Sequence, residues 1–127
     1  MPAPETLHSV PANDGYPIQV FAWAPPGPAR ALVQIAHGMG EHPRRYRELA
    51  EALTQVGCTV YANDHRGHGE EAALRNAKGD LGPRGFTGLV ADMMTVSEFA
   101  KAQHPGLPLI LLGHSMGSFA SQLYLLD

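Results

Sequence analysis

The stretch that decides the fold is Leu109-Ile110-Leu111-Leu112-Gly113-His114-Ser115-Met116-Gly117. Four apolar residues, typical of a buried strand, run into the pattern Gly-x-Ser-x-Gly. An apolar helical pattern follows, formed by Phe119, Ala120, Leu123 and Tyr124. Strand, tight turn and helix with a serine at the turn are the context of a nucleophile elbow. The turn strains the serine backbone, and the two glycines let strand and helix approach without Cβ clashes. Ser115 is therefore expected to stand at a helix N-terminus, where N–H groups favour developing negative charge.

The bulk composition is that of one globular domain. The chain has 127 residues, of which 44% are hydrophobic and 17% are charged, and its net charge of -3 gives no reason to expect nucleic acid as a partner. The single cysteine, Cys58, excludes an internal disulfide and is expected to pack as a small buried residue. No signal peptide and no transmembrane segment are visible, so we expect a soluble, cytoplasmic protein.

Strands and helices are expected to alternate along the chain. A hairpin should open it, with strands over 6–10 and 18–23 joined at Asn13-Asp14-Gly15. Further strands are predicted over 31–36, 58–62 and 109–112, and residues 70–85 are expected to be irregular. Helices are predicted over 43–56 and 86–103. The apolar face of the first helix should comprise Tyr46, Leu49, Ala50, Leu53 and Val56. That of the second should comprise Phe86, Leu89, Val90, Met93, Val96, Phe99 and Ala100.

This alternation predicts an α/β fold with a mostly parallel sheet, an antiparallel opening hairpin and flanking helices. Three polar or glycine-rich stretches follow strands, at 37–42, 63–69 and 113–118. Because sites in such sheets lie beyond the carboxyl ends of the strands, we expect these stretches to gather into one site.

Three motifs resemble the α/β-hydrolase superfamily, and within it the monoacylglycerol lipase and lysophospholipase group of serine hydrolases. They are His37-Gly38-Met39-Gly40-Glu41-His42 with Arg45-Tyr46 just after, Asp64-His65-Arg66-Gly67-His68-Gly69, and Gly113-His114-Ser115-Met116-Gly117. The resemblance covers nearly the whole chain. It implies a single α/β-hydrolase domain over 1–127, corresponding to the N-terminal portion of that fold, with the strand order 1-2-4-3-5.

The resemblance also implies roles for particular residues. Ser115 would be the acyl-accepting nucleophile, and the backbone N–H groups of Met116 and Met39 would form the oxyanion hole. No cofactor is implied. The stretch from Asp64 to Gly69 would shape the floor near the site, although Glu70-Glu71 stand where relatives commonly have a small hydroxyl residue. A metal site at Asp64, His65 and His68 is disfavoured, because zinc needs three or four convergent ligands and no further cluster of ligands is seen.

The base that a serine nucleophile needs is missing from the sequence after Ser115. All seven histidines precede it, whereas the family order is serine, then Asp or Glu, then His. We therefore expect the domain to be incomplete, without its C-terminal strands, lid, catalytic acid and histidine, and the chain alone to be inactive. The fifth strand would then leave an apolar edge unpaired, so the chain should be poorly soluble or need its other half.

Several functions remain open at this point. The leading one is hydrolysis of carboxylic esters, with a small-molecule, lipid-like monoester as substrate. Elbow and oxyanion loop are equally compatible with a peptidase or a thioesterase. A non-catalytic α/β binding module is favoured by the absent base, and a half-domain completed by a partner chain is a further alternative.

Overall fold

The computed structural model describes residues 4–74, 76 and 78–126. Its strands are β1 (Glu5–Pro11), β2 (Pro17–Trp23), β3 (Ala31–Ala36), β4 (Cys58–Asn63) and β5 (Leu109–Gly113). Its helices are the 3-10 helix η1 (Pro43–Tyr46), α1 (Arg47–Gln55), α2 (Gly69–Leu74), α3 (Gly85–Gln103) and α4 (Met116–Leu126). The predicted strands and the long second helix are confirmed to within a residue or two at their ends.

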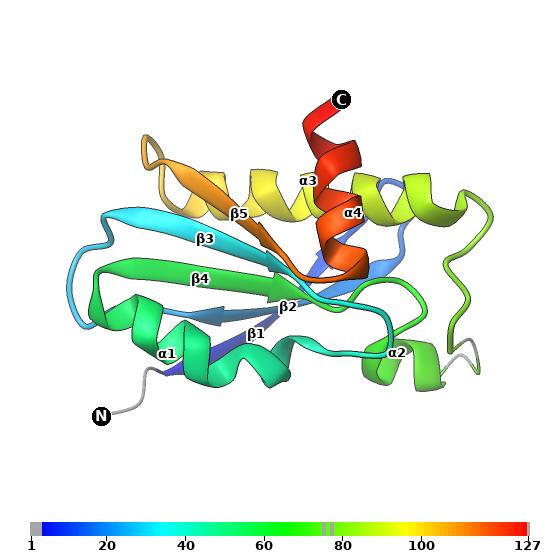
Figure 1. Cartoon of the computed structure of the whole chain (residues 1–127), viewed down its shortest axis with the longest axis horizontal. Helices are drawn as coiled ribbons and strands as arrows, with labels where there is room; N and C mark the ends of the chain where they lie inside the picture. The colour runs from blue at the N-terminus through cyan, green and yellow to red at the C-terminus, as the bar shows by residue number, and fades with distance from the viewer. Residues whose placement is uncertain (1–3, 75, 77, 127) are drawn as a thin grey trace.

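The strands form one mixed sheet in the order β1-β2-β4-β3-β5, which confirms the predicted order (Figure 1). β3 pairs in parallel with both β4 and β5, whereas β2 is antiparallel to β1 and to β4. Four strands therefore run the same way and β2 alone runs against them. Because β3, β4 and β5 are parallel, their carboxyl ends lie together at one end of the sheet, where the three motifs follow them.

The opening hairpin closes through the turn that the sequence indicated. Ala12 N–H donates to Tyr16 O at 2.9 Å, and Gly15 N–H donates to Ala12 O at the same distance. Gly15 has a φ of 88°, a left-handed conformation that glycine adopts without steric cost. The Asp14 side chain accepts the Tyr16 N–H at 3.1 Å, so the turn residues stabilise their own loop.

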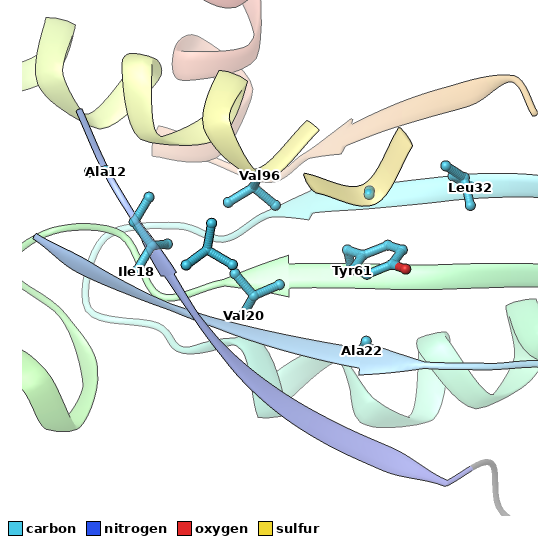
Figure 2. Close-up of a cluster of buried hydrophobic side chains, with 9 residues drawn as sticks. Ala12, Ile18, Val20, Ala22, Leu32, Tyr61 and Val96 are labelled. Atoms are coloured by element: carbon cyan, nitrogen blue, oxygen red, sulfur yellow. The ribbon is translucent and has the colours of Figure 1, made fainter. Parts of the chain in front are cut away.

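Helices cover both faces of the sheet (Figure 1). α1 packs on one face against β4 and β2, and α3 and α4 pack on the other face, α3 along β3, β1 and β4 and α4 against β5 and β3. β3 is almost wholly buried, as expected for a strand between two helical layers. Figure 2 shows the core under α3, where Val96 meets Ile18 and Val20 of β2 and Tyr61 of β4.

The predicted helix over 43–56 is wrong in two respects. Its first turn is the 3-10 helix η1, and only Arg47–Gln55 is α-helical. Ala50 and Thr54 are buried, but Leu49 and Val56 are 39% and 59% exposed. The 3-10 turn advances each residue by a larger angle than an α-helix, which shifts the phase of the buried face. Val56 already lies beyond the helix, at its C-cap.

Residues 70–85 are not wholly irregular either, since α2 begins at Gly69 and ends at Leu74. The glycines that follow α2 led to the prediction of a loop. The sequence of α2 itself, however, is mostly Glu and Ala, which are good helix formers. Cys58 is partly buried and packs against the core cluster under α1. Within the described residues, no helix combines the length and the apolarity needed to cross a lipid bilayer.

β5 forms one edge of the sheet, and its neighbourhood is apolar. Ile110 on the strand is 53% exposed and Phe119 on α4 is 66% exposed. We expect the 127-residue chain to self-associate through this edge, and the double substitution Ile110→Glu with Phe119→Glu to reduce the association. Sedimentation velocity over a range of concentrations measures it. A monomer at every concentration that unfolds cooperatively would contradict the expectation.

Candidate active site

The turn between β5 and α4 is a strained elbow with a serine at its apex. Ser115 has a φ of 56°, a left-handed conformation that is unusual for a residue other than glycine. The N–H groups of Gly117 and Ser118 donate to His114 O and Ser115 O, both at 2.9 Å, and so close the first turn of the helix. The Met116 N–H lies at the first position of α4, where an N–H group has no acceptor within the helix.

Two glycines are sterically required at the elbow, as the sequence predicted. A Cβ on Gly117 would overlap the carbonyl group of Ala36 at the end of β3. A Cβ on Gly113 would lie 2.6 Å from both Gly117 O and Ser121 Oγ. Because most of these atoms belong to the backbone, neither clash can be relieved by a side-chain rotation. The elbow therefore packs directly on the end of the neighbouring strand, and His114 N–H donates to Ala36 O at 3.1 Å.

The loop that follows β3 lies against the elbow. A Cβ on Gly38 would be 3.2 Å from Ser115 Cβ, so the two backbones approach without an intervening side chain. Met39 lies between two held amides, because Gly38 N–H donates to Glu41 Oε1 at 2.7 Å and Gly40 N–H donates to His68 Nε2 at 3.0 Å. Met39 is 59% exposed, whereas Met116 packs against the buried cluster that includes Ala36 of β3. The structure thus brings the three predicted site residues to one edge of the sheet.

Glu41 connects the loop to the rest of the site. Its Oε1 accepts hydrogen bonds from Gly38 N–H and from Tyr46 Oη at 2.6 Å, and its Oε2 pairs with Arg45 Nε at 2.9 Å. His114 Nδ1, next to the serine, lies 3.4 Å from the same Oε1. The hydrogen bond from Tyr46 lowers the pKa of Glu41 to about 2, and burial together with Glu41 raises the pKa of Tyr46 to about 12. Glu41 is therefore a carboxylate throughout the ordinary pH range.

Three buried histidines join the loop after β3 to the loop after β4. His37, His65 and His68 are 1%, 0% and 6% exposed, and the rings of His37 and His65 lie 4.1 Å apart. His65 N–H donates to His37 Nε2 at 3.1 Å, which puts the proton of His37 on Nδ1, facing Gly38 O at 2.7 Å. Burial lowers the pKa of His37 to about 4 and that of His65 well below its ordinary value. Both rings are therefore neutral at pH 7.

The buried neutral histidines predict a pH-dependent stability. The unfolded chain binds protons near the ordinary histidine pKa of 6.5 and the folded chain only near 4, so stability falls as the pH drops below 6.5. For His37 alone, we expect the free energy of unfolding to fall by about 2 kcal/mol between pH 7 and pH 5. Urea unfolding at the two pH values measures this loss. Equal stabilities would mean that the cluster does not exist in solution.

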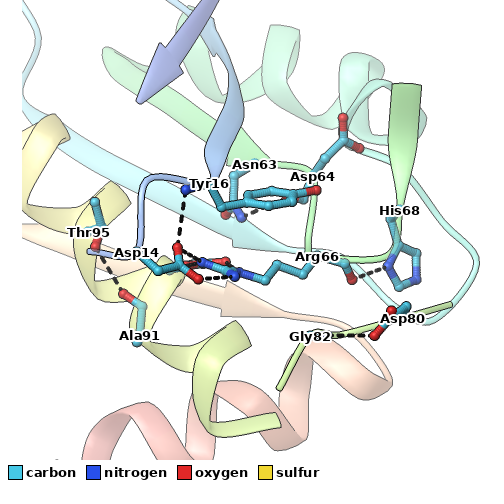
Figure 3. A network of polar contacts seen from close by, with 11 residues as sticks. Asp14, Tyr16, Asn63, Asp64, Arg66, His68, Asp80, Gly82, Ala91 and Thr95 are labelled. Carbon is cyan, nitrogen blue, oxygen red and sulfur yellow. Dashed lines mark hydrogen bonds and ion pairs between the residues drawn. The ribbon is translucent and has the colours of Figure 1, made fainter. Parts of the chain in front are cut away.

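Arg66, in the middle of the second motif, is the centre of a partly buried network of ion pairs (Figure 3). The Arg66 guanidinium pairs with Asp92 of α3, with Nε 2.6 Å from Oδ2, and with Asp14 of the hairpin turn, with Nη1 2.6 Å from Oδ2. Burial raises the pKa of Asp92, while Arg66 holds the pKa of Asp14 well below its usual range. The network joins the hairpin, the loop after β4 and α3. Asp14 was predicted only as a residue of the hairpin turn and Asp92 was not singled out, so no pattern indicated that both pair with Arg66.

A cavity of about 760 Å³ opens on the outer side of the loop after β3. Phe21, Met39, His68 and Lys78 are among the residues that line it, and Ser115 is not one of them. Glu70 and Glu71, where the motif departs from the family pattern, have side chains outside what the structure describes.

No base is found beside the serine in the part of the chain that the structure describes, where no hydrogen bond joins Ser115 Oγ to a histidine. The nearest histidine in sequence, His114, has a side chain that is 62% exposed and faces Glu41 and the ring of Tyr46. His37 is occupied by its hydrogen bonds to the backbone. Among the described residues, no group of three His, Cys, Asp or Glu side chains is arranged to hold a metal ion.

The strand order, the strained elbow at the end of β5 and the glycine-containing loop packed against it at the end of β3 are the architecture of an α/β-hydrolase. The sequence matches the Hydrolase_4 family, described as serine aminopeptidase S33, over residues 27–127. The chain belongs to this family, and the resemblance seen in its motifs is confirmed.

Individual relatives point to the same group. The human monoglyceride lipase is 39% identical over 104 residues, which are 82% of this chain and 33% of the relative. The monoacylglycerol lipase of Mycolicibacterium smegmatis is 40% identical over 110 residues, 87% of this chain and 38% of the relative. A thermostable carboxyl esterase from Bacillus coagulans superimposes with a TM-score of 0.88 at 33% identity, covering 94% of this chain and 39% of that one. The chain thus spans between a third and two fifths of the length of these proteins.

Proposed function

We propose that this chain supplies the nucleophile and the oxyanion hole of a serine hydrolase that cleaves carboxylic esters. The observation that carries the proposal is the strained Ser115, with a φ of 56°, packed against Gly38 of the neighbouring loop. The Met116 N–H at the start of α4 and the Met39 N–H of that loop are the two donors proposed for the oxyanion. In comparable sites, the loss of one such donor costs about 3 kcal/mol of transition-state stabilisation.

The proposed reaction proceeds through an acyl-enzyme. Ser115 Oγ attacks the ester carbonyl carbon and loses its proton to a base, while the carbonyl oxygen becomes the oxyanion. The intermediate collapses by breaking the bond to the alcohol, which leaves with that proton. Water then attacks the acyl group, passes its proton through the base to Ser115 and releases the acid. We assign the base and its carboxylate to sequence outside residues 1–127, since the relatives are two to three times as long.

A lipid-like monoester is the proposed substrate class. The two relatives compared above are named for lipases of monoglycerides, and each is about 40% identical to this chain. The proposed place for the reacting carbonyl group is beside Ser115, and the described residues around it do not enclose an acyl chain. The proposed substrate is therefore a lipid-like carboxylic monoester.

A fluorophosphonate probe tests the nucleophile directly, because it phosphonylates only an activated serine. We expect labelling of the chain extended by the sequence that follows residue 127, and none of its Ser115→Ala variant. The 127-residue chain alone is expected to stay unlabelled because it lacks the base. Ser118→Ala is the matched control, since it removes a hydroxyl three residues after Ser115, in the first turn of α4. If the extended chain remained unlabelled, a non-catalytic α/β binding module would replace the enzyme proposal.

A peptidase is the second candidate, because the family is described as a serine aminopeptidase. The same nucleophile and oxyanion donors serve an amide carbonyl, whose poorer leaving group needs stronger general-acid assistance. Rates on p-nitrophenyl butyrate and on an aminoacyl p-nitroanilide separate the two. We expect the extended chain to cleave the ester and to leave the anilide intact. The opposite preference would favour the peptidase.

A further inference from the structure

His68, in the second motif, makes contacts that the proposed reaction does not by itself explain. Its Nε2 accepts the Gly40 N–H at 3.0 Å, and its Nδ1 lies 3.1 Å from Arg66 O. An Nε2 that accepts a hydrogen bond is unprotonated, so the ring is neutral and Nδ1–H is the donor to Arg66 O. The imidazole therefore joins the backbone of Gly40 to that of Arg66, 26 residues further along the chain.

The atoms behind His68 are fixed as well. Arg66, whose carbonyl oxygen accepts from His68, has its guanidinium held by both oxygens of Asp92 and both of Asp14. Figure 3 shows His68 on one side of the Arg66 backbone and the carboxylate of Asp14 at the end of its side chain. The position of His68 is thus set by α3 and the opening hairpin through Arg66. A rigid support of this kind defines the direction of a hydrogen bond better than a mobile side chain does.

The held amide is next to one of the proposed oxyanion donors. Gly40 follows Met39, and Gly40 has a φ of 75° without any atom within 4 Å of a Cβ placed on it. The Met39 N–H belongs to the peptide between Gly38 and Met39. The peptide before that one carries the Gly38 N–H, which donates to Glu41 Oε1 at 2.7 Å. Rotation of the Met39 amide is therefore opposed from both sides. The carbonyl oxygen of the same peptide, Gly38 O, accepts from Glu41 N–H at 3.1 Å and lies 2.7 Å from His37 Nδ1, so the bond from Gly40 N–H to His68 adds a further restraint on the C-terminal side of Met39.

We propose that His68 is a positioning residue for the oxyanion hole, which directs the Met39 N–H by holding the Gly40 amide. This inference rests on the proposed function, because it assigns a catalytic consequence to the contact. It also explains why the second motif lies beside the first: the loop after β4 supports the loop after β3. Since the role concerns a donor to the transition state, its loss should lower kcat and leave KM nearly unchanged.

Two substitutions separate positioning from simple filling of space. His68→Leu keeps the bulk but removes the acceptor, whereas His68→Gln offers an amide oxygen to Gly40 N–H and an amide N–H to Arg66 O. His104→Gln and His104→Leu are the matched controls, because His104 lies at the C-cap of α3, at the opposite edge of the sheet. All variants are made in the extended chain, and each rate is divided by the folded fraction from circular dichroism.

The first measurement is kinetic, with p-nitrophenyl butyrate as substrate and the fluorophosphonate probe for Ser115. We expect His68→Leu to lower kcat and the labelling rate at least tenfold at a KM within twofold of wild type, and His68→Gln to restore both to within threefold. The second measurement is hydrogen–deuterium exchange of the peptide that spans 37–42. The exchange of this peptide should be faster in His68→Leu than in the wild type, and should return toward the wild-type rate in His68→Gln.

The possible results separate the positioning role of His68 from the proposed hydrolase activity. Wild-type kcat in His68→Leu, with exchange of the 37–42 peptide accelerated, would overturn the positioning role alone. Unchanged exchange in His68→Leu would show that the bond to Gly40 does not hold the loop, and would overturn it too. If the wild-type extended chain were neither labelled nor active, the proposed function would fail, and the catalytic role of His68 with it.

Discussion

The substitution Gly117→Ala is expected to unfold the chain or to destabilise it by more than about 4 kcal/mol. The added methyl group would overlap the carbonyl group of Ala36, which belongs to the backbone of the interior strand β3. Relief would require α4 to move away from β3 and β5, and the packing of Ala120 and Tyr124 would be lost with it. Typical domain stabilities are about 5–15 kcal/mol, so a loss of this size consumes most of the total.

Urea unfolding followed by circular dichroism measures the effect of Gly117→Ala. Gly27→Ala is the matched control, because the same change at Gly27 meets no atom within 4 Å and Gly27 does not have a left-handed φ. We expect the control to alter stability by less than about 1 kcal/mol. Comparable losses in the two variants would show that α4 does not pack against β3 as described.

The substitution Arg66→Met should cost about 3–5 kcal/mol of stability, the usual price of breaking a buried ion pair from one side. The Asp92 side chain is 5% exposed, and Arg66 is the cation bound to both of its oxygens. Methionine keeps much of the volume and leaves the carboxylate buried without that cation. Since burial already raises the pKa of Asp92, the variant should recover part of its stability as the pH falls and the carboxyl group takes up a proton.

Two further variants test the origin of the loss in Arg66→Met. Adding Asp92→Leu removes both buried charges, and the double variant should be more stable than Arg66→Met alone. Asp14→Asn should be milder, because the Asp14 side chain is 52% exposed and water can replace part of the contact. Unfolding curves at pH 7 compare all four proteins. A double variant that is no more stable than Arg66→Met alone would contradict the buried pairing.

Local patterns predicted the elements that carry the fold. The apolar runs of β3, β4 and β5 and the Asn13-Asp14-Gly15 turn are signals contained in a few consecutive residues. The strand order, by contrast, came from the resemblance, because pairing between distant strands leaves little trace in one sequence. The exposure of Leu49 was mispredicted because helical spacing alone does not show that a 3-10 turn precedes α1 and shifts its phase.

The site was predictable where glycine and serine spacing dictate a turn, and not where it depends on distant partners. Ser115, Met39 and Met116 occupy motif positions, and the structure places them at one edge of the sheet. Their catalytic roles stay predictions. The contact of Arg66 with Asp14 spans 52 residues and that with Asp92 spans 26, so neither could be inferred from neighbouring residues. The bond between Gly40 and His68 is of the same kind.

The histidine bridge between the loops after β3 and β4 also bears on the order of synthesis at the ribosome. The contacts that hold the residues around Met39 come from Glu41 and His68, and long chains fold largely from the N-terminus as they emerge. The loop after β3 can thus take its shape once residue 68 has left the exit tunnel and before the turn at Ser115 appears. Synthesis would then add the strained turn to a loop that is already in place.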